Sequence, residues 1–119
     1  MQQIKYFIFL CAVFLTSNSF AQQTDAKKVK VSGKVLDKIT SQPLEYTTIT
    51  FVEVGNPSAV SGGITDAKGE FNFDVKTGVY NIKIEFISFK PVEIKNRTIK
   101  NAVNLGTFSL VEDATMLEA

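Results

Sequence analysis

The side chains that most resemble a chemical site lie in the heptapeptide TDAKGEF, residues 65–71. Asp66 and Gly69 stand three positions apart between apolar stretches, a spacing found both in calcium loops and in tight turns. An EF-hand loop needs further oxygen ligands at alternate positions and a glutamate at the twelfth, whereas an alanine and a lysine occupy the middle here. Aspartate accepts hydrogen bonds from the backbone of a turn, and glycine tolerates a left-handed conformation. We therefore predict a structural corner at Asp66 and Gly69, with no metal bound.

Nothing else in the chain completes a catalytic site. The sequence contains no histidine, which removes the commonest general base and the usual partner of a serine nucleophile. The nearest paired carboxylates are Glu112 with Asp113, in a polar tail, and Asp66 with Glu70, beside the predicted corner. Neither pair has a nucleophile or a metal-ligand cluster nearby in the sequence. We predict that the protein is not an enzyme and has no catalytic residue and no cofactor.

The first 21 residues are typical of a secretory signal peptide. One lysine precedes an apolar run over residues 7–15, and the small residues Ser19 and Ala21 follow. The run is too short to cross a bilayer, which takes roughly 20 apolar residues. We expect cleavage after Ala21, which removes Cys11 and leaves an exported chain without cysteine and without a transmembrane segment. We expect this chain in the periplasm or at the outer membrane.

The charge of the exported chain excludes one class of partner. Lys5 is the only charged residue in the signal, so 12 of the 13 basic residues remain against 12 acidic ones. Binding to nucleic acid needs a clear excess of clustered basic residues. We therefore predict that this chain does not bind nucleic acid. Several lysines do share one face of the first predicted strand, and we interpret them as protection of an exposed sheet edge, with an acidic partner or lipid headgroups as the alternative.

Alternation of apolar and polar residues predicts an all-β protein. The clearest case is Tyr80 to Phe86, which follows a turn at Gly78 and is expected to be the central strand. The strand over 92–99 alternates in charge, as edge strands do, and a change of parity at Gly106 predicts a β-bulge. The expected strands cover residues 28–35, 46–54, 59–65, 70–76, 80–86, 92–99 and 103–111. Seven short strands in one domain indicate an antiparallel seven-stranded Greek-key β-sandwich.

Several of these stretches, taken in order, resemble the carboxypeptidase regulatory-like domain, a transthyretin-like sandwich of exported bacterial proteins. The resemblance runs from about Val29 to Glu118. It departs at Ser88-Phe89, where the family usually has Gly-Tyr, and at Thr77, where a proline is usual. The stretches are VSGKVLDKITSQPLEYTTITF, GGITDAKGEFNFDV, TGVYNIKIEFISFKPVEI and NLGTFSLVEDATMLEA. The zinc chemistry of carboxypeptidases does not come with the resemblance, because it requires histidine ligands.

The resemblance also implies a context. Such a domain after a signal peptide looks like the N-terminal extension of a TonB-dependent outer-membrane receptor for nutrient uptake, in which a plug and barrel follow. The expected organisation is a signal peptide over 1–21, a linker over 22–28, the sandwich over 29–111 and a connector over 112–119. The module would act through protein contacts. The alternative is a free-standing periplasmic or cell-surface domain that binds a glycan or a protein through the aromatic side chains of Tyr46 and Phe89.

Overall fold

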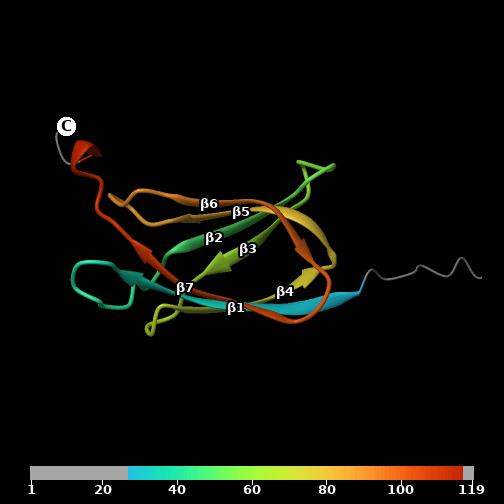
Figure 1. Ribbon diagram of the computed structural model, residues 1–119, viewed down its shortest axis with the longest axis horizontal. Helices are drawn as coiled ribbons and strands as arrows, with labels where there is room; N and C mark the ends of the chain where they lie inside the picture. Colours follow the sequence, from blue (N-terminus) through green and yellow to red (C-terminus); the bar gives the residue numbers. More distant parts are fainter. Residues whose placement is uncertain (1–26, 117–119) are drawn as a thin grey trace, which may run out of the picture.

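The computed structural model describes residues 27–116, which form seven β-strands and one short 3-10 turn (Figure 1). The expected signal peptide, most of the expected linker and the last residues of the connector lie outside this range. The elements are β1 (Lys28–Asp37), β2 (Thr48–Glu53), β3 (Val60–Ile64), β4 (Glu70–Lys76), β5 (Gly78–Glu85), β6 (Val92–Ile99), β7 (Val103–Leu110) and η1 (Ala114–Met116). Within residues 27–116 no helix has the length and apolar character needed to cross a membrane.

The strands form two sheets that pack face to face as a β-sandwich. One sheet has three strands in the order β4-β1-β7, and the other has four in the order β3-β2-β5-β6. This confirms the predicted sandwich, with β5 inside its sheet and β6 at an edge. The prediction of a wholly antiparallel arrangement is wrong in one place, because the first and last strands, β1 and β7, pair in parallel. Alternation along a strand shows which side chains face the core, but it carries no information on which strand lies alongside or in which direction.

The core lies between the sheets and follows the predicted alternation. Val31 and Val35 of β1 and Phe51 of β2 are fully buried. Phe51 makes edge-to-face contacts with the rings of Phe73 and Tyr80, at centroid distances of 6.3 and 6.0 Å, the geometry that aromatic quadrupoles favour. Burial of these side chains stabilises the domain by roughly 1.5–3 kcal/mol each relative to exposure.

Two further expectations about β1 have different outcomes. The bulge at Gly106 is confirmed, because the register of β1 against β7 shifts between Ser32 and Lys34. The idea that the lysines of β1 protect a sheet edge is wrong, because β1 lies between β4 and β7. Two of its lysines instead lie opposite acidic residues of β4, Lys30 opposite Asp74 and Lys34 opposite Glu70, whereas Lys28 lies opposite Lys76.

The chain enters and leaves the sandwich at opposite ends (Figure 1). Because β1 and β7 run in the same direction, the segment after β7 emerges at the end where β1 finishes. The loop from β1 to β2, the corner before β4 and the loop from β5 to β6 gather at that same end. We call it the loop end, and it carries the candidate site.

Candidate functional site

The predicted corner is a tight turn built from its own backbone and one carboxylate. The Oδ1 atom of Asp66 accepts hydrogen bonds from the backbone N–H groups of Lys68 and Glu70, at 2.9 and 3.0 Å. The N–H of Gly69 donates to the carbonyl of Asp66 at 2.9 Å, and Gly69 has a φ of 71°. Within residues 27–116 no group of three or more histidine, cysteine, aspartate or glutamate side chains is placed to hold a metal ion. The hydrogen bonds of Asp66 and the left-handed backbone of Gly69 therefore form the predicted turn.

Gly69 also lies where a side chain has no room. A Cβ atom at this position would collide with the carbonyl oxygen of Val35 and would lie 3.1 Å from the Cβ of Pro43. The corner thus packs directly on the segment that leads into β2. Gly78, the other predicted turn glycine, is the first residue of β5 and lies beside the ring of Tyr80.

Two buried threonines connect this corner to the turn at Glu45 and Tyr46, which comes earlier in the chain. Thr47 and Thr65 are almost fully buried, and both hydroxyl groups donate to the carbonyl oxygen of Leu44. The Oγ1 atom of Thr65 also accepts a hydrogen bond from the N–H of Thr47 at 2.9 Å. Sequence reasoning missed this pair, because threonines in strand-like segments are usually surface residues and only the tertiary structure shows their burial. Their hydrogen bonds hold the turn at Glu45 and Tyr46 in place.

That turn puts Tyr46 in an unusual backbone conformation. Its φ is 64°, a left-handed value that costs a bulky residue about 1–3 kcal/mol. The N–H of Tyr46 donates to the carbonyl of Thr65, while its side chain is 67% exposed. The sequence pattern predicts a strand from residue 46, but β2 begins only at Thr48. The turn therefore holds a large aromatic ring out in solvent, in a conformation that glycine would adopt without strain.

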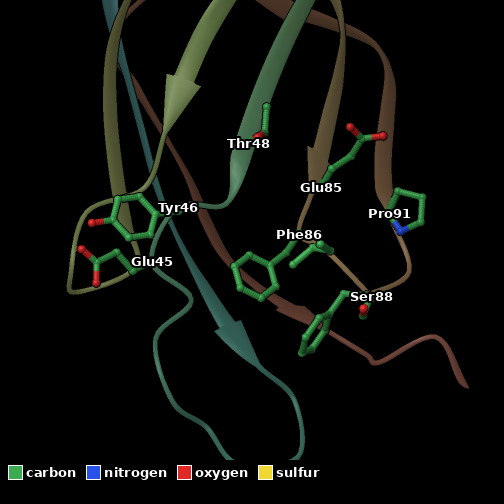
Figure 2. A pocket seen from close by; sticks show the side chains of 9 residues that line it. Glu45, Tyr46, Thr48, Glu85, Phe86, Ser88 and Pro91 are labelled. Carbon is green, nitrogen blue, oxygen red and sulfur yellow. The ribbon is translucent and has the colours of Figure 1, made fainter. Parts of the chain in front are cut away.

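The exposed ring borders a groove at the loop end (Figure 2). Figure 2 shows Glu45 and Tyr46 on one side, Pro91 and Glu85 on the other, and Phe86 between them. The groove has a volume of about 670 Å³, and we call it the Tyr46 groove. Its lining residues are Glu45, Tyr46, Thr48, Glu85, Phe86, Ile87, Ser88, Phe89 and Pro91.

The two aromatic residues predicted as a binding surface both line this groove, but they differ in exposure. Tyr46 is largely exposed, whereas Phe89 is only 8% exposed and packs against Phe86 with ring centroids 5.3 Å apart. Phe89 is therefore not available as the exposed ring that the alternative binding function needs. β5 ends at Glu85, and Phe89 follows in a turn where Ser88 has a φ of 67°, so the alternation along β5 does not determine the direction of the Phe89 ring. Ile87, which the sequence did not single out, is 83% exposed instead.

The charged groups of the groove are all acidic. Glu45 and Glu85 line it, and no lysine or arginine does. Lys83 lies just outside and forms an ion pair with Glu85 at 2.7 Å, the one salt bridge found within residues 27–116. The Glu45 carboxylate beside Tyr46 has no ion-pair partner in the same part of the chain.

The far wall of the groove is tied to the segment that follows β7. The N–H of Lys90 donates to the carbonyl of Val111, and the N–H of Asp113 donates to the carbonyl of Ser88, both at 2.8 Å. The Asp113 carboxylate in turn accepts hydrogen bonds from Thr115, which lower the pKa of that carboxyl below its ordinary value. The exit of the chain and the groove wall are thus one hydrogen-bonded unit.

Comparisons with solved structures support the fold. A type II cohesin–X-dockerin complex from Acetivibrio cellulolyticus contains a chain 27% identical over 66% of this one, with a TM-score of 0.53. This protein spans about half, 52%, of that chain. A putative carbohydrate binding protein from Bacteroides uniformis is 20% identical over 71% of this chain and 41% of its own, with a TM-score of 0.55.

A different activity appears on a similar scaffold. The 3-chlorocatechol 1,2-dioxygenase of Rhodococcus opacus 1CP is 9% identical over 77% of this chain and 62% of its own, with a TM-score of 0.57. At such identities the likeness concerns the fold alone, since one fold carries many functions. None of the curated proteins compared matches the sequence.

A family comparison agrees with the resemblance noted from the sequence. Residues 30–111 match the family described as the carboxypeptidase regulatory-like domain, a match that covers most of the chain and β1 to β7 almost entirely. The expected transthyretin-like sandwich and the observed sheets are consistent with it. The chain belongs to the carboxypeptidase regulatory-like domain family.

Proposed function

We propose that this chain is a non-catalytic, exported β-sandwich module that acts through protein contacts, as the N-terminal extension of a TonB-dependent outer-membrane receptor for nutrient uptake. The proposal includes export through the signal peptide over residues 1–21 and a position facing the periplasm. Family membership and the order of the sequence features support this context.

The observation that carries a contact function is the chemistry of the loop end. Exposed apolar side chains stand in its loops: Ile39 is 80% exposed, Ile87 83% and Tyr46 67%. The polar groups at the corner and at the buried threonines are engaged in hydrogen bonds with the fold itself. Other exposed apolar residues lie elsewhere, among them Val60 at 59%, but these three are the most exposed of the large apolar side chains in the described residues. Highly exposed apolar side chains beside a groove favour binding to another protein over chemistry on a substrate.

A glycan-binding function is less well supported by the same groove. Sugars stack on exposed aromatic faces, and the burial of Phe89 removes one of the two rings on which that function depended. Tyr46 alone remains available for stacking. We therefore place the protein-contact function first.

An immunoblot on separated periplasmic and outer-membrane fractions of the native cells tests the context. We expect the antigen in the outer membrane at a mass many times the 13.1 kDa of this sequence. A small band in the periplasmic fraction would contradict the receptor context and would indicate a free-standing binding domain.

A further inference from the structure

We infer that the Tyr46 groove binds an extended segment of a partner protein in which an arginine stands beside an aliphatic residue. The inference rests on the proposed protein-contact function, but it does not require that the module belongs to a receptor. It follows from the apolar floor, the charge and the backbone strain of the groove.

The apolar part of the groove can bury a side chain of the partner. Phe86 forms its floor, with Ile87 and Pro91 also among its lining residues (Figure 2). Ile87 is 83% exposed, so covering it removes apolar surface that now contacts water. An aliphatic side chain of the partner fits this lining, because it makes no demand for hydrogen bonds.

The charge of the groove selects a basic neighbour for that aliphatic residue. Glu45 lies beside the exposed ring of Tyr46 and has no ion-pair partner within residues 27–116, while Glu85 already pairs with Lys83. A guanidinium group is planar, so it can stack on a tyrosine ring and donate two parallel hydrogen bonds to a carboxylate at its edge. Arginine satisfies both groups at once, whereas lysine offers a point charge without a stacking face.

The strain at Tyr46 indicates that its ring serves something other than stability. Glycine would adopt a φ of 64° freely, yet the turn carries a tyrosine whose side chain is mostly in solvent. The buried hydroxyls of Thr47 and Thr65 hold the turn, so the ring is presented at a fixed place. Strained residues that the surroundings keep in place cluster at binding sites.

A titration of the isotope-labelled exported chain with a short capped peptide, monitored by amide chemical shifts, tests the inference. The peptide carries one arginine between two leucines, and the comparison peptide carries citrulline, a neutral residue of the same shape. We expect shifts at residues 44–48 and 85–91 with the arginine peptide, and binding at least about tenfold weaker with the citrulline peptide. Added salt should weaken binding of the arginine peptide.

Three variants locate the contact. Tyr46→Ala should weaken binding of the arginine peptide about tenfold, because the stacking face is lost. Glu45→Gln should remove most of the preference for arginine over citrulline while leaving the fold intact. Glu70→Gln is the matched control, since Glu70 is an exposed carboxylate on β4 outside the groove, and it should bind as the parent does. If Tyr46→Ala lowers the melting temperature so far that its binding cannot be interpreted, the Glu45→Gln variant tests the inference by the same titration.

Some outcomes would overturn the inference. They are no shifts with the arginine peptide, equal binding of both peptides, or shifts at the groove produced by soluble xylan or starch fragments and not by peptide. The last result would assign the groove to a glycan. Each of these results is independent of the immunoblot, so peptide binding and receptor context can fail separately.

Discussion

Two turns at the loop end differ in how they use a left-handed backbone. In the corner over residues 66–69, glycine occupies the left-handed position, and the Asp66 carboxylate accepts hydrogen bonds from backbone N–H groups of the turn. The turn at Glu45 and Tyr46 has a similar φ but carries a tyrosine, and its carboxylate and ring point to solvent. A turn whose residue types match its conformation is accounted for by folding. The mismatch at Tyr46 is what indicates a binding function.

The two turns are nevertheless joined. Thr65 stands immediately before the corner, and its hydroxyl bonds to the segment that holds Tyr46. Gly69 lies against Pro43 and Leu44 of the same segment. The corner thus supports the Tyr46 turn, and substitutions in the corner should affect the groove through the position of Tyr46.

The largest effect should come from Gly69→Ala. The new Cβ would collide with the carbonyl of Val35 at a φ of 71°, so we expect a loss of about 3 kcal/mol in the free energy of unfolding, measured by urea denaturation. Gly55→Ala is the matched control: Gly55 also has a positive φ, 105°, but nothing lies within 4 Å of a Cβ there. It should lose only about 1 kcal/mol. Equal losses for both variants would show that the corner does not pack as described.

Thr65→Val should have the next largest effect. Valine has the same shape but cannot bond to Leu44 or to the N–H of Thr47, so we expect a loss of about 2 kcal/mol in urea denaturation. The arginine peptide should also bind more weakly, because the Tyr46 turn is no longer held. Thr50→Val on the outer face of β2 should change neither property. Unchanged peptide binding in Thr65→Val would show that the Tyr46 turn does not depend on the hydrogen bonds of Thr65.

Asp66→Ala should cost less, about 1 kcal/mol, because the N–H groups that it frees are exposed to water. Asp66→Asn keeps an acceptor oxygen and should lose less still. The melting temperature of both variants and of the parent should be the same in calcium and in EDTA. A melting temperature that rises with calcium only when Asp66 is present would contradict the prediction that no metal binds at this corner.

The smallest effect, and one of opposite sign, is expected for Tyr46→Gly. Relief of the left-handed strain should stabilise the fold by about 0.5 kcal/mol after allowance for the greater freedom of glycine in the unfolded chain, while the arginine peptide should bind about tenfold more weakly, as with Tyr46→Ala. Asn96→Gly provides the control, since Asn96 has a φ of 54° on β6, away from the groove. It should leave binding unchanged. A clear destabilisation by Tyr46→Gly would mean that the ring supports the fold.

Local patterns predicted the strands and the corner well because those features depend on neighbouring residues. The alternation from Tyr80 to Ile84, the parity change at Gly106 and the turn at Asp66 each report backbone geometry within a few positions. The parallel pairing of β1 with β7 joins strands about seventy residues apart, and no local pattern specifies it.

The groove escaped prediction for the same reason. It unites residues 45–48 with residues 85–91, and it exists only once β2 and β5 lie side by side. Ser88 stands where the family usually has glycine, and only the structure shows that Ser88 adopts a φ of 67°, a left-handed value that favours glycine. In the turn that contains Ser88, Phe89 is buried and Ile87 is exposed, and the strand pattern that ends at Glu85 does not specify the burial of Phe89.

The parallel pairing of the first and last strands also has a mechanical consequence. A pull that separates Lys28 from Leu110 draws β1 and β7 past each other along their length, so the hydrogen bonds between the two strands bear the load together. Strands that separate from one end, as in a hairpin pulled open, release their bonds one after another. Tension along the chain therefore loads the hydrogen bonds between β1 and β7 in shear, and force is transmitted from β1 to β7 without first opening the sandwich.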